Sequence, residues 1–193
     1  MQQRLSVALF GAPGSGKGTQ AALIAEKYRF EHISTGELFR NEMAMETPLG
    51  LKAKQIVEQG LLCPDDITLN MLYNRIQNVQ DGQGVILDGV PRTMQQAQMM
   101  NGIGFDHIIP ISFVIYLNIN KEQVINRIMK RAELLNRSDD NPAAIETRIE
   151  SYARSTEPLK SYYLSQNILF EVDGMQAIDS VFADVCKVID AHL

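Results

Sequence analysis

The chain has 193 residues, 45% of them hydrophobic, which suits one domain spanning residues 1–193 with a core of its own. Its formal net charge of -5 argues against nucleic acid and anionic membranes as partners, because both need a broad basic face. No apolar run approaches membrane length, and we expect a cytoplasmic protein. The two cysteines, Cys63 and Cys186, lie far apart in the sequence, which argues against a structural zinc site.

The first predicted element is a strand, Leu5 to Phe10, which leads into a glycine-rich loop and then a helical pattern from Gln20 to Tyr28. The loop reads Gly11-Ala12-Pro13-Gly14-Ser15-Gly16-Lys17-Gly18-Thr19. A strand, a glycine loop and a helix in this order predict a phosphate cradle, because backbone N–H groups and the positive end of the helix point at phosphate oxygens. Lys17 then reaches the outer phosphates. Ser or Thr usually follows this lysine to bind Mg²⁺, whereas here Gly18 takes that place and Thr19 comes next.

Further β-rich runs alternate with helical patterns along the chain. They are Glu31 to Ile33, Val85 to Leu87, Ser112 to Leu117 and Ile168 to Phe170. Together with the first strand they predict an α/β fold with one five-stranded parallel sheet. Right-handed crossovers would bring the carboxyl ends of the strands, and the loops after them, to one edge where ligands bind.

The connection between the second and third predicted strands is too long for a single crossover helix. It holds three helical patterns, Thr35 to Met43, Pro48 to Gln59 and Asp65 to Val79. Thr47 before Pro48 predicts an N-cap followed by proline at the first helical position. We therefore expect a small helical flap in this connection.

The third predicted strand ends in Asp88-Gly89-Val90-Pro91-Arg92. An acidic side chain at the end of a buried strand, beside a phosphate loop, can hold Mg²⁺ directly or through water. The alternative is that Asp88 only caps a turn before Gly89. Arg92 lies just past a proline at the expected ligand edge, where its guanidinium can bind a phosphate with two hydrogen bonds. Taken alone, it would be a surface arginine.

Arginines are concentrated between the fourth and fifth predicted strands. Arg127 and Arg131 share a helix face, Arg137 follows in a loop, and Arg148 lies in a helix that Asn141-Pro142 starts and that buries Ile145, Ile149 and Tyr152. In an acidic protein such arginines are usually solvated or paired with neighbours such as Asp139 and Asp140. Beside a phosphate loop we favour the other interpretation, in which they clamp phosphate charge.

The glycine loop is one of several motifs whose order and spacing are informative together. The others are His32-Ile33-Ser34-Thr35-Gly36-Glu37-Leu38-Phe39-Arg40, Asp88-Gly89-Val90-Pro91-Arg92-Thr93 and Arg137-Ser138-Asp139-Asp140-Asn141. Over essentially the whole chain this set resembles the adenylate kinases, which similarly carry Gly-Lys-Gly-Thr. The resemblance implies a P-loop NTPase-type fold with an NMP-binding flap at residues 34–63 and a short lid loop at residues 131–137. Val90, where relatives usually have Phe or Tyr, and the absence of glycine from the lid depart from the family pattern.

Carried over by position, the resemblance implies two sets of nucleotide-binding residues. ATP would contact Gly14, Ser15, Gly16, Lys17, Gly18, Thr19, Arg131 and the backbone at Gln176. AMP would contact Thr35, Arg40, Leu61, Leu62, Cys63, Gly89, Val90, Pro91, Arg92, Gln96, Arg137 and Arg148. Charge stabilisation would come from Lys17, Arg92, Arg131, Arg137 and Arg148, and Asp88 would hold Mg²⁺ through water.

The activity implied by the resemblance is reversible phosphoryl transfer from MgATP to AMP, giving two ADP, by a monomer that uses Mg²⁺ and no zinc. No covalent intermediate is expected, because no residue pair looks like an activated nucleophile. The nearest alternative is a uridylate/cytidylate kinase of the same architecture. A GTP-binding switch would need an Asn-Lys-x-Asp motif and a dinucleotide-dependent dehydrogenase Gly-x-Gly-x-x-Gly, and neither is present.

Gln96 is the residue expected to distinguish an adenylate kinase from a uridylate/cytidylate kinase. Its amide can accept from the adenine amino group and donate to a ring nitrogen, a pattern that uracil cannot match. Thr35 adds a hydroxyl near the base, whereas uridylate/cytidylate relatives typically have Ala at position 35 and Asn at positions 93 and 96. The alternative is that Thr35 only caps the flap helix and that Gln96 is a solvated helix residue.

Overall fold

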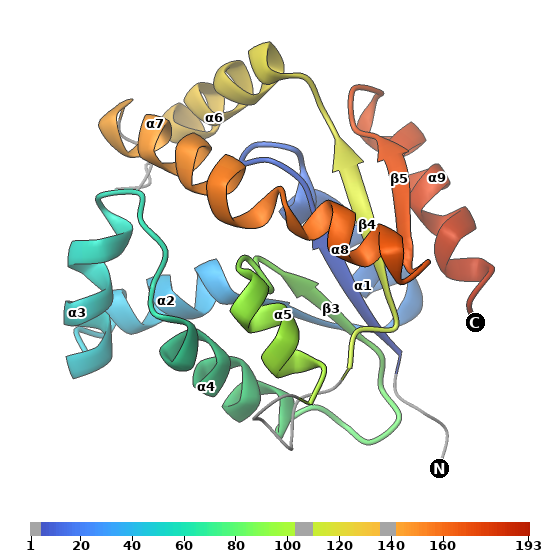
Figure 1. The fold of residues 1–193 in the computed structure, drawn as a ribbon, viewed down its shortest axis with the longest axis horizontal. Helices are drawn as coiled ribbons and strands as arrows, with labels where there is room; N and C mark the ends of the chain where they lie inside the picture. Colours follow the sequence, from blue (N-terminus) through green and yellow to red (C-terminus); the bar gives the residue numbers. More distant parts are fainter. Residues whose placement is uncertain (1–4, 103–109, 136–141) are drawn as a thin grey trace.

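A parallel sheet forms the centre of the molecule (Figure 1). The computed structural model describes residues 5–102, 110–135 and 142–193, and residues 121, 130–135, 142 and 143 by their backbone alone. The strands are β1 (Ser6–Phe10), β2 (Glu31–Ser34), β3 (Val85–Asp88), β4 (Phe113–Asn118) and β5 (Leu169–Asp173), in the order β2-β3-β1-β4-β5. The predicted α/β fold with five parallel strands is therefore confirmed. β5 continues beyond the predicted end at Phe170, and its residues Glu171 and Asp173 are exposed, which the position of β5 at the edge of the sheet allows.

Side chains alternate between the two faces of the sheet, as the pleat requires. Ala8 and Phe10 of β1 enter the core on one face, and Val7 and Leu9 enter the core on the other. Helices α4 (Asp65–Ile76), α5 (Met94–Met100) and α8 (Leu159–Ser165) cover the first face, and α1 (Lys17–Tyr28) and α9 (Ile178–Asp190) cover the second. Figure 1 shows β1 at the centre of this sandwich, so the loop after β1 emerges at the middle of the sheet edge.

Helices α2 (Thr35–Ala44) and α3 (Pro48–Val57) form a separate small layer with its own apolar cluster around Phe39, Ala53 and Cys63. The predicted cap is confirmed, because the Thr47 hydroxyl accepts a hydrogen bond from Gly50 N at 2.9 Å and Pro48 is the first helical residue. Ser34, rather than Thr35, caps α2. The interpretation of Thr35 as a helix cap is therefore wrong.

Helix α4 departs from the expectation that the long connection forms one flap. Its buried residues Leu69, Leu72 and Ile76 pack in the main core against the sheet, while Ile67 and Met71 contact the cluster of α2 and α3. The helix thus belongs to the central layer and supports the smaller layer on its other side. Within the connection, α2 and α3 are the helices that project beyond the sheet (Figure 1).

Helices α6 (Lys121–Leu135) and α7 (Pro142–Ser151) pack together through Val124, Ile128 and Ile145. The predicted stripe on α7 is correct for Ile145 and Ile149 and wrong for Tyr152. A π-helical stretch, Tyr152–Thr156, follows α7 directly and changes the angular spacing of side chains. The Tyr152 hydroxyl instead lies 3.3 Å from that of Tyr116. Among the described residues, no helix is long and apolar enough to cross a membrane.

Candidate active site

The loop between β1 and α1 is shaped by glycines with positive φ angles. Gly14 has φ of 77° and Gly16 has φ of 96°, a region that side chains disfavour. At Gly11 a Cβ atom would lie 2.6 Å from Ser15 Oγ and 2.7 Å from Leu117 O. The loop can therefore close tightly over the end of the sheet only with glycine at this position, and it delivers Lys17 to the first turn of α1.

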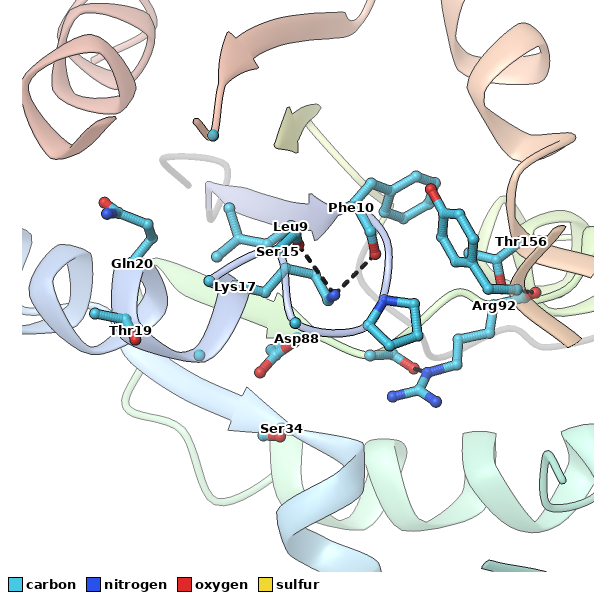
Figure 2. A pocket seen from close by; sticks show the side chains of 18 of the residues that line it. Leu9, Phe10, Ser15, Lys17, Thr19, Gln20, Ser34, Asp88, Arg92 and Thr156 are labelled. Atoms are coloured by element: carbon cyan, nitrogen blue, oxygen red, sulfur yellow. Dashed lines mark hydrogen bonds between the residues drawn. The ribbon is translucent and has the colours of Figure 1, made fainter. Parts of the chain in front are cut away.

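The Lys17 ammonium points back into this loop, as Figure 2 shows. Its Nζ donates to Gly11 O at 2.8 Å and to Ala12 O at 2.9 Å, and it lies 3.4 Å from Ser15 Oγ. These contacts hold the positive charge inside the curve of the loop, at the N-terminus of α1. The charge and the helix end together favour an anion at this place.

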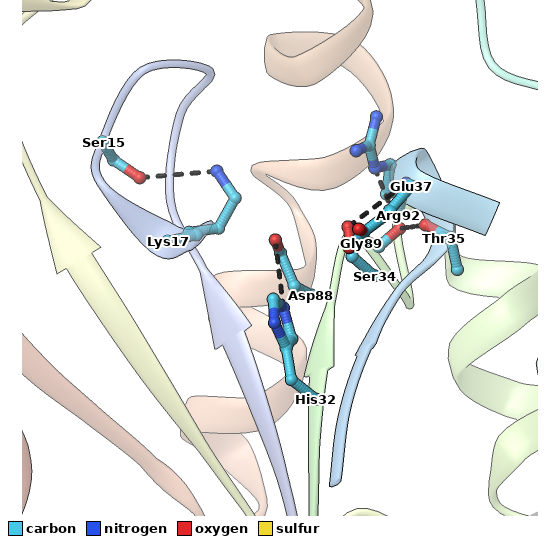
Figure 3. Close-up of polar contacts among 9 residues, drawn as sticks. All are labelled: Ser15, Lys17, His32, Ser34, Thr35, Glu37, Asp88, Gly89 and Arg92. Carbon is cyan, nitrogen blue, oxygen red and sulfur yellow. Dashed lines mark hydrogen bonds and ion pairs between the residues drawn. The ribbon is translucent and has the colours of Figure 1, made fainter. Parts of the chain in front are cut away.

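Asp88, the last residue of β3, faces Lys17 across the end of the sheet (Figure 3). Burial alone would raise the pKa of this carboxyl, but the His32 imidazole and the charges of Lys17 and Arg92 outweigh it and hold the pKa below its usual value. His32 Nε2 lies 3.7 Å from Asp88 Oδ2. The carboxylate is therefore ionised at neutral pH.

The turn after Asp88 contacts α2 through one of its carbonyls and the π-helical stretch through another. Gly89 O accepts hydrogen bonds from Thr35 Oγ1 and from Arg92 Nε, both at 2.9 Å. Thr156 Oγ1, from the π-helical stretch, donates to Arg92 O at 2.9 Å. Gly89 has φ of 84°, and a Cβ there would lie 2.7 Å from Thr35 Oγ1. These contacts fix the direction of the Arg92 guanidinium (Figures 2 and 3).

These elements enclose a cleft of about 970 Å³ at the carboxyl edge of the sheet. Predicted site residues from distant parts of the sequence line it together, as expected for this edge. They are Gly14, Ser15, Gly16, Lys17, Gly18, Thr19, Arg40, Leu62, Asp88, Gly89, Pro91, Arg92, Arg148 and Gln176. The prediction that Arg148 points into a cleft agrees with this placement.

A smaller cavity of about 70 Å³ adjoins the cleft, and the predicted site residues Leu62, Gly89, Arg92 and Arg148 line both. The other predicted residues along it are Thr35, Leu61, Cys63 and Gln96. Gln96 is only 2% exposed, so its interpretation as a solvated helix residue is wrong. Burial raises the pKa of the Cys63 thiol to about 11, against the opposing charge of Arg92, and the thiol is therefore a neutral part of the wall.

Among the predicted site residues whose side chains the structure describes, Val90 lines neither space. The Val90 side chain is 1% exposed and packs in the main core, so any contact with a ligand would have to come from its backbone. Arg137 lies outside the described residues, as does residue 136, whereas residues 131–135 of the expected lid form the end of α6. Arg131 is in α6, but its side chain is not described.

The cleft also contains side chains that the sequence analysis did not assign to a site. Arg127, Glu37, Asn41 and Tyr152 line it. Arg127 belongs to the arginine cluster of the sequence and lies one helical turn before Arg131, a spacing that indicates the same helix face. Glu37 and Asn41 lie on the same face of α2 as Arg40. Their spacing of three and four residues in a helix could have indicated this.

The glycine loop between a central parallel strand and a helix, with a cationic cleft at the carboxyl edge, defines a P-loop nucleotide-binding protein. The sequence profile of the family described as "Adenylate kinase" matches residues 9–168. The chain belongs to the adenylate kinase family.

Individual relatives agree with this assignment. An adenylate kinase from Parabacteroides distasonis is 38% identical over 186 residues, which cover 96% of this chain and 98% of the relative. One from Methylorubrum populi is 38% identical, with 96% of each chain covered. One from Clostridium botulinum is 34% identical, with 96% of this chain and 99% of the relative covered.

Proposed function

We propose that the protein catalyses reversible phosphoryl transfer from MgATP to AMP, giving two ADP. The observation that carries the proposal is the pair of adjoining cavities, one built on the phosphate loop and one on Gln96, which share Arg92 and Arg148 in their walls. A reaction between two nucleotides needs two such sites with cationic groups where they meet, because the transferred group carries several negative charges. Membership of the adenylate kinase family supports the same reaction.

In this proposal ATP lies along the loop from Gly14 to Thr19 and toward Gln176. AMP has its base in the smaller cavity and its phosphate in the cleft, which Arg40 and Pro91 line. Lys17 stabilises the migrating group, while Arg92 and Arg148, which line both spaces, hold the phosphates in line. Arg131 and Arg137 would complete this clamp from the lid, residues 131–137. The flap, residues 34–63, and the lid would close over the nucleotides and exclude water, which protects ATP from hydrolysis.

Mg²⁺ fits the chemistry of the residues around Asp88. The carboxylate is ionised, and a Cβ on Gly18 would lie 3.7 Å from Asp88 Oδ2, so this carboxylate lies beside the start of α1. Mg²⁺ in such sites is typically held by one or two carboxylates, water and phosphate oxygens. Asp88 would hold the ion through water, and the ion would neutralise phosphate charge. No zinc is proposed, and we expect a cytoplasmic monomer.

The choice of acceptor is the sharpest test of the proposal. Each buried polar group left unpaired by a wrong base costs about 1–3 kcal/mol, so several losses give roughly a hundredfold preference or more. A coupled assay with AMP, UMP, CMP and GMP as acceptors should show kcat/KM for AMP at least about a hundredfold above UMP and CMP. Comparable efficiency with AMP and CMP would overturn the proposal in favour of a uridylate/cytidylate kinase.

A pair of neighbouring glutamines provides the matched variants. Gln96→Ala should reduce the preference for AMP over UMP and CMP, chiefly by lowering kcat/KM for AMP, because Gln96 is buried beside the cavity. Gln95→Ala changes an exposed residue of the same helix and should leave the preference unaltered. Equal effects of the two substitutions would contradict the role proposed for Gln96.

A further inference from the structure

The Gln96 amide is held in one orientation by two neighbours of opposite character. Arg92 N donates to Gln96 Oε1 at 2.7 Å, and Gln96 Nε2 donates to Asp65 Oδ1 at 2.7 Å. Turning the amide over would place its oxygen against the carboxylate and its NH₂ group against the N–H of Arg92. Each contact would then change from attractive to repulsive, so both partners specify the same orientation.

Asp65 is the first residue of α4 and is itself anchored. Its second oxygen, Oδ2, accepts a hydrogen bond from Thr93 Oγ1 at 2.8 Å, and Thr93 in turn caps α5 by accepting from Gln96 N at 3.1 Å. The carboxylate is half-buried between α4 and α5 and lines neither the cleft nor the smaller cavity. Its described hydrogen bonds to Thr93 and Gln96 connect it to the wall of the smaller cavity, which Gln96 lines.

We propose that Asp65 is a positioning residue that selects 6-amino over 6-oxo purines by fixing the orientation of the Gln96 amide. The inference rests on the proposed function, in which Gln96 contacts the base of AMP. An amide retains a further N–H and a further oxygen lone pair beyond the contacts to Asp65 and Arg92. These are the groups that a base in the smaller cavity would meet.

The two classes of purine present opposite patterns to that amide. Adenine offers an amino donor at position 6 and an acceptor at the neighbouring ring nitrogen. Hypoxanthine offers an acceptor at position 6 and a donor at the ring nitrogen, so it pairs with the amide only after the amide has turned over. In the wild-type protein that turn breaks the contacts to Asp65 and Arg92 together. Without the carboxylate, only the Arg92 contact opposes it.

The test compares AMP with inosine 5′-monophosphate, whose base differs from adenine in carrying the 6-oxo group. The constants measured are KM for AMP and the competitive inhibition constant of inosine 5′-monophosphate, with MgATP as donor. Asp65→Ala should lower the preference for AMP by about tenfold, the effect of losing one hydrogen bond to a charged group. Asp66→Ala removes the same charge from the next, exposed residue of α4 and should leave the preference unchanged.

If Asp65 had a purely structural role at the start of α4, Asp65→Ala would lower the melting temperature and weaken the binding of both nucleotides equally. The inhibition constant of inosine 5′-monophosphate divided by KM for AMP measures the preference for AMP. A purely structural role would leave this ratio at the wild-type value, and this outcome would overturn the proposal. A fall in the ratio with Asp65→Ala, together with no fall with Asp66→Ala, supports it.

Repeating the substitution in a Gln96→Ala background shows whether Asp65 acts through Gln96. The proposal expects Gln96→Ala to lower the ratio by itself and Asp65→Ala to add nothing further. A full additional effect would overturn the positioning role. If Gln96→Ala leaves the ratio unchanged, the contact of Gln96 with the base is wrong. If Gln96→Ala lowers the ratio and Asp65→Ala does not, only the inference about Asp65 is wrong.

Discussion

Lys17 shows how a single residue combines a structural and a chemical role. Its Nζ donates to the carbonyls of Gly11 and Ala12, which stabilises the curve of the phosphate loop. The same ammonium lines the cleft with Arg92, at the place where transferred charge would develop. A substitution here therefore removes a loop contact and a preorganised charge together.

Lys17→Ala is expected to reduce turnover by about 100-fold or more, the scale of loss for one preorganised charge donor. Lys27→Ala removes the same group from the last turn of the same helix, outside the cleft, and should leave turnover near the wild-type value. The measurement is steady-state turnover of both purified variants, with melting temperatures to verify folding. A folded Lys17→Ala protein that kept more than about a tenth of wild-type turnover would contradict the mechanism.

At this scale the sequence predicts well where local geometry demands one residue type. The glycines of the phosphate loop, Lys17 and Asp88 follow from the requirement for close backbone approach and for charge at the end of a strand. His32 was not predicted to approach Asp88, because that contact depends on the pairing of β2 with β3. The contact between Asp65 and Gln96 likewise depends on how α4 packs beside α5, which no local pattern reveals.

Among the elements, the flap helices depend on their caps more than the central helices do. Helix α3 buries only Gly50 and Ala53, whereas α4 buries Leu69, Leu72 and Ile76 against the sheet. A short helix with so little buried surface relies on the hydrogen bond from Gly50 N to the Thr47 hydroxyl and on the proline that follows Thr47.

Thr47→Ala should destabilise α3 by about 1 kcal/mol, the usual effect of removing such a cap. Because few contacts connect α3 to the main core, the effect should stay local. Amide hydrogen exchange in residues 48–57 is expected to accelerate about fivefold, while exchange in β1 stays unchanged and serves as the internal control. Equal acceleration in β1 and α3 would contradict the separate layer described for α2 and α3.

Element positions were predicted well where an apolar run or a cap marks them, as with β3 and α3. The membership of α4 was predicted less well, because its apolar residues face two directions and sequence spacing does not say which face meets the sheet. The end of α7 was also missed. A π-helical stretch has no sequence signal of its own, so Tyr152 was assigned to α7, which ends at Ser151.

At the scale of the whole molecule, the net charge of -5 contrasts with the cleft. Lys17, Arg40, Arg92, Arg127 and Arg148 all line it, whereas Asp88 and Glu37 are its acidic side chains among the described residues. The positive charge is thus concentrated where phosphates are proposed to bind. Within the described residues, no group of three or more His, Cys, Asp or Glu side chains is arranged to hold a metal ion.

The metal requirement follows from this distribution of charge. A single nearby carboxylate suits Mg²⁺ that arrives with the nucleotide phosphates, rather than an ion that the protein retains. We expect a chelator to abolish activity and added Mg²⁺ to restore it. Elemental analysis of protein purified without added zinc should find no stoichiometric transition metal. One equivalent of such a metal in the purified protein would contradict this account.

The central claim is that the cleft and the smaller cavity transfer a phosphoryl group between two nucleotides. The most direct measurement follows ATP, AMP, ADP and inorganic phosphate together over time, in one reaction containing Mg²⁺ and in a second that lacks AMP. The account predicts two ADP for each ATP consumed, the reverse reaction when ADP alone is supplied, and almost no phosphate release without AMP. Consumption of ATP to ADP and inorganic phosphate at an equal rate in the reaction without AMP would contradict it.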